Sequence, residues 1–212
     1  MTFKYAIAAA SIAMMATGAA SAATITTLYN TGVDNSGVAT TGNGVDLHWT
    51  LAGGTAYTGG VNGVFPIGPW LAETSTSRWI TSTPTASDGV GSPFTYSTTF
   101  SLGGLNPSTA ALTGQFAGDN GVTAILLNGT LISTGADGFS SFTSFSSGAT
   151  PFISGTNTLT FQLRNDGGPA GLRVEVVGTA DAVPEPAAWT LMIVGFGLVG
   201  VAARRHTSVV TA

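Results

Sequence analysis

The sequence predicts an all-β protein: a jelly-roll β-sandwich flanked by an N-terminal signal peptide and a C-terminal transmembrane helix. Three observations predict this arrangement. Apolar and polar residues alternate with a period of two through the middle of the chain, which is typical of half-buried strands. The 30 glycines divide these runs into short segments. The two ends each carry an uncharged apolar run, in a chain where only 8% of residues are charged.

The composition excludes several classes of function. The chain of 212 residues has no cysteine, which excludes disulfides, a thiolate nucleophile and a Cys-ligated zinc site. Lys and Arg together number 6 and form no basic patch, so we expect no binding to nucleic acid. An apolar content of 43% is sufficient for a packed core and argues against disorder.

The first 22 residues have the pattern of a secretory signal peptide. Lys4 supplies a positive charge, an apolar run follows over 5–18, and Ala20 and Ala22 form a small-x-small cleavage site that leaves Ala23 as the new N-terminus. The apolar run of about 14 residues is short for a membrane span, although a retained N-terminal anchor is the alternative. The pattern predicts a secreted protein that passes through the translocon across the inner membrane.

Residues 23–181 are expected to form one β-sandwich domain. Asn128-Gly129 predicts a two-residue hairpin because both residues tolerate positive φ. Within this domain, no window of about 12 residues shows a convincing helical stripe. Strands are expected at 24–29, 46–51, 94–102, 112–116, 122–127, 130–133, 139–145, 158–164 and 172–176, and a short linker at 181–183.

The segment 182–212 carries the most specific pattern of the chain. The tripeptide Pro184-Glu185-Pro186 precedes an uncharged run over 187–203, which Arg204 and Arg205 follow directly. The run predicts a transmembrane helix close to the lower length limit. The arginine pair forms a basic tail that predicts a transmembrane stop on the cytoplasmic side. A plain C-terminal anchor is the alternative interpretation.

This segment resembles the PEP-CTERM sorting signal. The tripeptide, Trp189, the Gly195-Phe196-Gly197 stretch and the arginine pair follow one another as in the variant with a tryptophan shortly after the tripeptide. The resemblance implies recognition by an exosortase, a membrane-embedded, transpeptidase-like enzyme of Gram-negative bacteria that would cut near the tripeptide. It also implies association with exopolysaccharide or the biofilm matrix.

The middle of the chain resembles galactose-binding-like jelly rolls, the fold of many carbohydrate-binding modules. The resemblance rests on the order of three segments, Phe116–Gly121, Leu127–Gly129 and Gly155–Phe161. It implies the fold, and function only by analogy. No ligand residue can be carried over, because the ligand residues of that family lie in variable loops.

Enzymatic groups are sparse in the domain, and we expect no catalytic residue. His48 is its only histidine and lies in the apolar-flanked strand Leu47-His48-Trp49, where a strand-face role is expected instead of a Ser-His-Asp triad. Glu73 and Glu175 are its only glutamates. Glu175 alternates outward on the last strand, so no carboxylate pair for glycoside hydrolysis is evident.

Tyr57, Trp70 and Asp119 are the candidate ligand contacts. Tyr57 and Trp70 fall in the Gly- and Pro-rich stretch 53–71, which is expected to be a long loop, and aromatic rings can stack on sugar rings. Asp119 precedes Asn-Gly, so a turn without a ligand is the alternative. The core is expected to take the other tryptophans of the domain, Trp49 and Trp79.

No metal site and no cofactor are expected. A structural calcium ion is the one alternative, because oxygen ligands are available at Asp34, Asn35, Asp46 and Asp166, although no EF-hand-like loop occurs.

Together these patterns predict an exported, exosortase-sorted protein of the cell surface or extracellular matrix. It is expected to be transiently anchored in the inner membrane, non-catalytic, associated with exopolysaccharide and able to bind carbohydrate. The alternatives are a structural surface-coat protein without a specific ligand and, less favoured, an enzyme.

Overall fold

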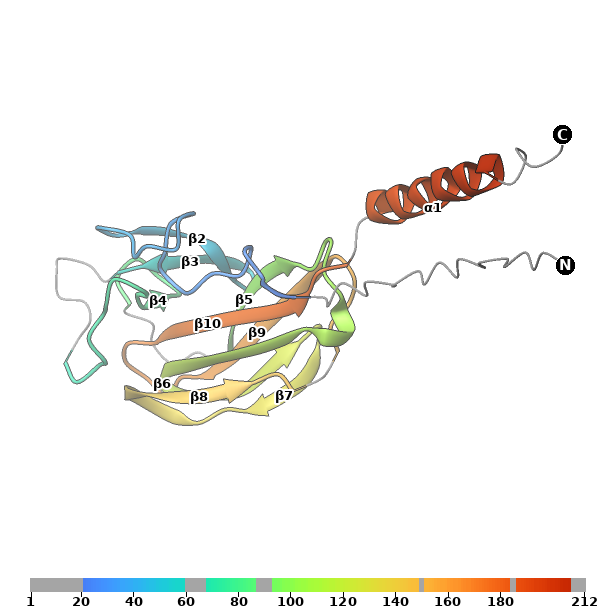
Figure 1. The fold of residues 1–212 in the computed structure, drawn as a ribbon. Coiled ribbons are helices and arrows are strands. Elements are labelled where there is room, and N and C mark those ends of the chain that lie inside the picture. The colour runs from blue at the N-terminus through green and yellow to red at the C-terminus, as the bar shows by residue number, and fades with distance from the viewer. Residues whose placement is uncertain (1–20, 60–67, 87–92, 149–150, 184–185, 207–212) are drawn as a thin grey trace, which may run out of the picture.

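The computed structural model describes residues 21–59, 68–86, 93–148, 151–183 and 186–206 (Figure 1). Most of the predicted signal peptide, with Ala20 of its cleavage site, lies outside these residues, as do Pro184 and Glu185. The described chain is mostly β, as predicted. Its elements are β1 (Ala22–Thr24), β2 (Gly44–Leu51), β3 (Gly54–Thr58), β4 (Ile80–Thr81), β5 (Phe94–Ser101), the 3-10 turn Pro107–Thr109, β6 (Ala111–Leu127), β7 (Thr130–Thr134), β8 (Asp137–Ser146), β9 (Thr156–Arg164), β10 (Gly171–Asp181) and α1 (Pro186–His206).

A single antiparallel sheet takes in all the described strands. It forms a closed ring in the order β10-β4-β3-β2-β5-β9-β6, because β6 pairs again with β10 and completes the circuit. β1 attaches to β10, whereas β7 and β8 attach to the other edge of β6. The predicted β-sandwich thus takes the form of one antiparallel sheet that closes on itself.

β6 closes the ring because it is long enough to serve two neighbours. Its residues 111–119 pair with β10, and its residues 121–127 pair with β9. The register shifts between Val122 and Ala124, as in a bulge, which bends a strand and increases its twist. The sequence favours two strands separated by a turn near Asp119. The structure corrects this interpretation, because the strand continues through Asp119.

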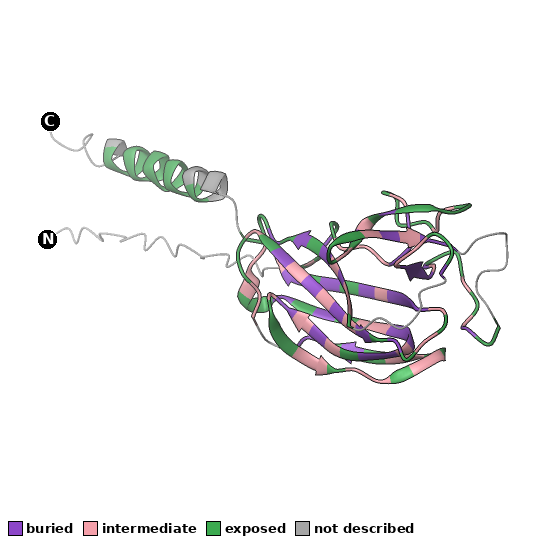
Figure 2. Cartoon of the chain, turned by 180° about the vertical axis from the view of Figure 1, so that it is seen from behind, coloured by how far each residue is buried: buried purple, intermediate pink, exposed green. Residues whose placement is uncertain are grey.

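The predicted alternation gives the ring its core. On β9, Leu159, Phe161 and Leu163 are fully buried, while the residues between them are partly exposed. Figure 2 shows buried residues alternating with more exposed ones along strands of the domain. The ring of Phe161 packs against those of Phe116 and Phe145, with centroids 5.9 and 5.4 Å apart. Aromatic pairs at such spacings contribute about 0.5–1.5 kcal/mol beyond their buried area, so this cluster stabilises the closed sheet.

β7 follows β6 through the predicted hairpin. Asn128 and Gly129 have positive φ angles of 50° and 81°, which a two-residue type I′ turn requires. The Asn128 side chain also ties the hairpin to β9. Its Nδ2 donates to Oδ1 of the buried Asn157 at 2.8 Å, and its Oδ1 accepts from the Thr158 amide at 2.9 Å.

α1 occupies the segment in which the sequence predicts a transmembrane helix over 187–203. The helix is confirmed, but no helix in the described part of the chain combines the length and the apolar character that crossing a membrane requires. The span over 187–203 and the transmembrane stop at Arg204 and Arg205 stay predictions.

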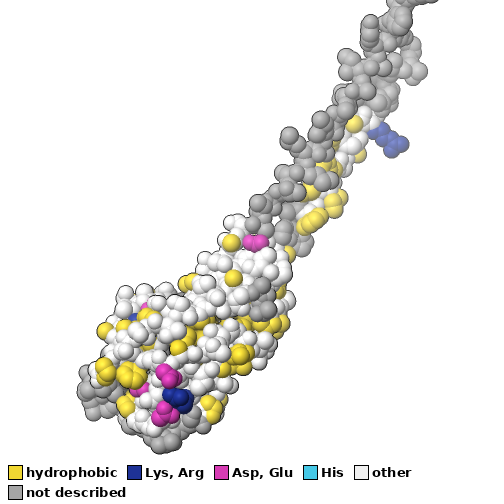
Figure 3. Space-filling model, turned by 90° about the horizontal axis from the view of Figure 1, so that it is seen from below, with side chains coloured by type: hydrophobic (Ala, Val, Ile, Leu, Met, Phe, Trp, Pro, Cys, Tyr) yellow, Lys and Arg dark blue, Asp and Glu magenta, His cyan; other side chains and the backbone are white. Residues whose placement is uncertain are grey.

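Charge is sparse on the surface of the domain. Figure 3 shows a face made mostly of backbone and uncharged polar side chains, with few acidic and basic groups. Arg164 forms exposed ion pairs with Asp137 at 3.2 Å and with Asp166 at 3.1 Å. The other ion pairs among the described residues belong to a more buried network beside β10, which is described next.

Candidate functional site

The outer face of β10, β6 and β8 carries rows of mainly polar side chains. Successive side chains alternate across a sheet, so residues of β10 that do not enter the core point to this outer face. Strand register forms two such rows, Glu175–Gln115–Ser144 and Val177–Thr113–Ser146. Each row joins three segments that are far apart in the sequence.

An open groove of about 570 Å³ lies over these rows. Thr113 and Ser144 are exposed, and their side chains make no hydrogen bond to another described residue. Both hydroxyls are therefore available to a ligand, as donors and as acceptors. The described lining contains no Lys or Arg and consists of Asn30, Thr76, Thr113, Gly114, Gln115, Ser144, Phe145, Glu175, Val176 and Val177.

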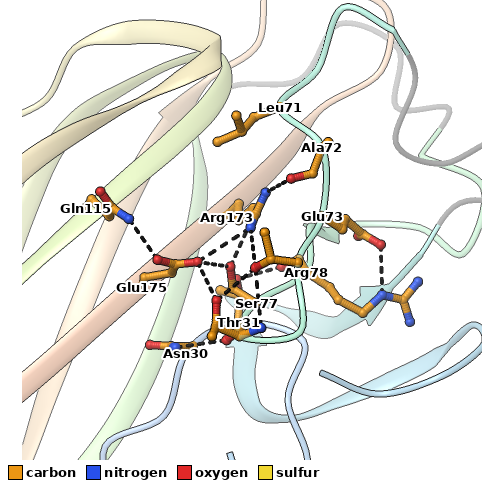
Figure 4. Close-up of polar contacts among 12 residues, drawn as sticks. Asn30, Thr31, Leu71, Ala72, Glu73, Ser77, Arg78, Gln115, Arg173 and Glu175 are labelled. Atoms are coloured by element: carbon orange, nitrogen blue, oxygen red, sulfur yellow. Dashed lines mark hydrogen bonds and ion pairs between the residues drawn. The ribbon is translucent and has the colours of Figure 1, made fainter. Parts of the chain in front are cut away.

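At one end of the groove, the same outer face is covered by another segment of the chain, and an arginine is buried beneath it. Residues 70–79, the covering segment, lie over Arg173, which is 0% exposed. Its guanidinium donates to Ser77 Oγ at 2.7 Å, to Thr74 Oγ1 at 3.0 Å and to the carbonyl of Ala72 (Figure 4). Every one of these bonds joins β10 to the covering segment.

The surroundings of Arg173 are apolar as well as hydrogen-bonded. The ring of Phe142, on β8, lies 4.9 Å from the guanidinium carbon, a distance at which a cation and an aromatic ring attract. Burial lowers the pKa of Arg173, and the charges of Glu175 and Glu73 partly oppose that shift. Arg173 is thus a central contact that fixes how the covering segment lies on the sheet.

Glu175 lies where the covered end meets the groove (Figure 4). Its Oε1 accepts from Ser77 Oγ at 2.7 Å and Thr76 Oγ1 at 2.9 Å, and its Oε2 accepts from Gln115 Nε2 at 2.7 Å. Burial raises the pKa of Glu175, but these hydrogen bonds and the charge of Arg173 outweigh burial and lower the pKa below its ordinary value of 4.5. The carboxylate is therefore ionised at neutral pH and held in one orientation.

The covering segment is also fixed at its far end. Arg78 Nε pairs with Glu73 Oε2 at 3.0 Å, and the Trp79 amide donates to Glu73 Oε1 at 2.9 Å. Arg78 further donates to the carbonyl of Thr40 at 3.0 Å. These contacts preorganise the wall of the groove before any ligand arrives.

Two of the three predicted ligand contacts meet inside the protein. Trp70 Nε1 donates to Asp119 Oδ2 at 2.7 Å, and these residues are only 7% and 6% exposed. Burial raises the pKa of Asp119, and the bond from Trp70 partly opposes this shift. The ring of Trp70 lies 4.3 Å from that of Trp79, which is buried as predicted. Tyr57 lies half-buried in β3, not in a long loop.

His48 and the candidate calcium ligands have structural contacts. The His48 ring stacks on Tyr29 with centroids 3.7 Å apart, consistent with the expected strand-face role. Asp46 accepts backbone N–H groups at 2.7–2.8 Å, and burial raises its pKa against the effect of these bonds. Asp34 accepts backbone N–H groups in the same way. Among the described residues, no group of three or more His, Asp or Glu side chains could hold a metal ion.

The groove residues Thr113, Gln115 and Ser144 are absent from the predicted ligand contacts. The signal available in the sequence is their place at outward positions of alternating strands. That signal does not say which outward residues share a row, because the register between strands is not encoded locally.

The C-terminal segment matches a known family model, that of the PEP-CTERM protein-sorting motif, over residues 182–205. The chain carries a PEP-CTERM sorting motif. The motif implies processing by an exosortase, and PEP-CTERM proteins are exported and sorted to the cell surface. The match begins at residue 182, so its first two residues, Ala182 and Val183, lie at the end of the β domain.

Three solved structures with distant likeness are carbohydrate-binding modules. The family 11 module of the cellulase Lic26A-Cel5E of Clostridium thermocellum is 12% identical, with 69% of this chain and 99% of that chain covered and a TM-score of 0.35. The CBM36-1 domain of a xylanase from the hindgut metagenome of Trinervitermes trinervoides is 17% identical, with coverage of 44% and 76% and a TM-score of 0.32. A CBM36 module in complex with calcium and xylotriose is 12% identical, with coverage of 76% and 99% and a TM-score of 0.30. Likenesses this distant carry no conclusion about the function of this chain, and no curated protein matches it.

Proposed function

We propose that the chain is an exported, exosortase-sorted protein of the cell surface or extracellular matrix, whose β domain binds a neutral polysaccharide without catalysis. The motif match over 182–205 is the observation that carries this proposal. The predicted signal peptide over 1–22, with cleavage before Ala23, supports the same route. The proposed partner is exopolysaccharide of a Gram-negative biofilm, and the proposed domain over 23–181 is a galactose-binding-like jelly roll.

The chemistry of the groove supports a neutral, hydroxyl-rich ligand. The free hydroxyls of Thr113 and Ser144 can donate to and accept from sugar hydroxyls. The ionised Glu175 accepts hydrogen bonds and repels anions, and no described lining residue is basic. Val177, which is 63% exposed, offers an apolar contact for the C–H groups of a sugar ring.

The groove also supports binding without turnover. Glu175 is the only acidic side chain among the described residues that line it. Glycoside hydrolysis generally uses a pair of carboxylates on either side of the bond. The three hydrogen bonds that Glu175 accepts keep its carboxylate ionised. An ionised carboxylate is unsuited to act as a proton donor.

The binding proposal is tested with the processed protein purified from cells. Affinity electrophoresis in gels that contain dextran, xylan or a soluble cellulose, with alginate as an anionic comparison, measures binding. We expect retention by a neutral polysaccharide, weakened about tenfold or more by Ser144→Trp, which fills the groove; tenfold is about 1.4 kcal/mol. Ser140→Trp, exposed on the same strand but outside the groove lining, is the matched control.

Two results separate this proposal from its alternatives. No retention by any neutral polysaccharide would favour the surface-coat protein, and retention that Ser144→Trp leaves unchanged would contradict the groove as the binding site. Mass spectrometry of the mature chain should show Ala23 at the N-terminus and loss of the segment beyond Pro184. An intact C-terminal segment in cells that contain an exosortase would contradict the sorting function.

A further inference from the structure

The end of β10 is fixed by hydrogen bonds up to the residue before the sorting tripeptide. The Asn106 amide donates to the Asp181 carbonyl at 2.8 Å, and the Asp181 amide donates to Thr109 Oγ1 at 2.8 Å. The Val183 amide donates to the carbonyl of Gly104 at 2.9 Å. The sequence suggests a linker over 181–183, and these bonds correct that interpretation, because the three residues belong to the folded domain.

The N-terminal strand holds the same residues from the other side. In the chain cleaved before Ala23, Ala23 and Thr24 of β1 pair with Ala180 and Thr179 of β10. Leu105 forms an isolated bridge with Ala182. We call the two surrounding segments, Ala23–Thr24 and Gly103–Thr109, the exit rim, because the chain leaves the domain between them.

The sorting motif starts inside this arrangement. The family match begins at residue 182, and the tripeptide follows Val183 without an intervening residue. One extended residue spans at most about 3.6 Å, so the whole tripeptide lies within about 11 Å of Val183. A stable protein interface covers about 800 Å² on each partner, a patch about 28 Å across, which is wider than this reach. An enzyme that binds the tripeptide of the folded protein must therefore also meet the exit rim.

We propose that the exit rim is a docking surface for the exosortase that processes the motif, an inference that rests on the proposed sorting function. The rim has no charged side chain and consists largely of small polar and apolar residues, which allow a partner to approach closely. Beside it, a hollow of about 360 Å³ opens between residues 108–113 and the end of β8. This hollow gives the partner a concave surface next to the site of cleavage.

A charged substitution on the rim tests the proposal. Ser108 is exposed in the turn Pro107–Thr109, and Ser108→Arg adds bulk and charge there. Ser140→Arg is the matched control, on an exposed residue of β8 toward the end that pairs with Gly121, away from the rim. Substitutions at such surface positions change stability by about 0.5 kcal/mol or less, and thermal melts of both variants check this.

The readout is the rate at which the full chain loses its C-terminal segment in cells that contain an exosortase, followed by immunoblot after a pulse of expression. We expect Ser108→Arg to slow processing several-fold and Ser140→Arg to leave it unchanged. A photo-crosslinking residue at position 108, but not at position 140, should capture the exosortase. A flexible spacer of about ten Gly and Ser residues between Val183 and Pro184 should restore the rate of Ser108→Arg without speeding the unmodified chain.

Each other outcome has a definite meaning. Equal processing of the two arginine variants overturns the docking surface and leaves the sorting function intact. The docking surface is also overturned if the spacer speeds processing of the unmodified chain, because the rim is then an obstruction. It is overturned as well if the spacer fails to restore the processing rate of Ser108→Arg. An unmodified chain that is never processed overturns the proposed sorting function itself.

Discussion

The outer face of β10 is covered at one end and open at the other. Arg173 is 0% exposed, and Val177, on the same face of the same strand, is 63% exposed. The alternation of the strand gives both residues the same direction, so the strand itself does not explain the difference. The covering segment, residues 70–79, explains it, because its groups surround Arg173 and leave Val177 open.

Polar groups are used differently at the two ends. At the covered end the guanidinium of Arg173 is bonded to three groups of the covering segment. At the open end the hydroxyls of Thr113 and Ser144 have no described protein partner. Buried polar groups that are left unpaired are costly, so the covered end serves stability, and the free groups of the open end can serve binding. Glu175 lies at the boundary and does both.

The largest expected effect comes from removing the cation at the covered end. Arg173→Met leaves Glu175 without its charge partner and the acceptors of the covering segment without a donor. Removing one partner of a buried pair typically costs about 3–5 kcal/mol of unfolding free energy, measured by urea denaturation. Arg164→Met is the control, because its ion pairs are exposed and such pairs contribute about 0–1 kcal/mol. Equal losses in the two variants would show that the covered end has no special role.

A second prediction concerns the packing beneath the covering segment. A Cβ added at Gly171 would lie 2.7 Å from the ring of Trp70 and 3.2 Å from the Ile80 carbonyl. Overpacking a tight site costs about 1–3 kcal/mol, so Gly171→Ala should lower the urea midpoint. Gly54→Ala is the control, because a Cβ there meets nothing within 4 Å. A Gly171→Ala variant as stable as the control would mean that the Trp70 ring is free to move and that the covered end is loosely packed.

The sequence predicted the local features of this molecule well. Alternation located the strands β5, β9 and β10, and Asn128-Gly129 located the hairpin, because both patterns act over a few residues. The sorting motif was identified for the same reason, since its residues are contiguous.

The site depended on relations that the sequence does not show. Gln115 and Glu175 are bonded across 60 positions, and Trp70 and Asp119 across 49. Register between distant strands is fixed by the packing of the whole sheet, so neither pair could be read from local patterns. Trp70 and Asp119 were predicted as ligand contacts, whereas the structure buries them and pairs them with each other inside the domain. Arg173 alternates to the same outer face as Glu175, but the covering segment places it in the interior.

The smallest expected effect, and the one that separates the two ends most directly, is the pH dependence of two carboxyl groups. The pKa of Glu175 is lowered in the fold, so its contribution to stability is complete above pH 4.5 and is lost as the pH falls through the folded pKa. The pKa of Asp119 is raised above 3.8 by burial, so ionising it costs stability as the pH rises from 3.8 through the folded pKa. Ionisation of these two carboxyl groups, which lie on one face of one sheet, therefore changes the stability of the fold in opposite directions.

Two amide variants measure these contributions. The stability deficit of Glu175→Gln relative to the unmodified chain should shrink on acidification below pH 4.5, where Glu175 itself becomes protonated. Asp119→Asn keeps an acceptor for Trp70, and its stability relative to the unmodified chain should rise as the pH increases above 3.8. Urea midpoints between about pH 3 and pH 7 follow both differences, with the mature domain checked for reversible unfolding at each pH. If both differences changed in the same direction with pH, the covering segment would not create two electrostatic environments, and the boundary at Glu175 would have no basis.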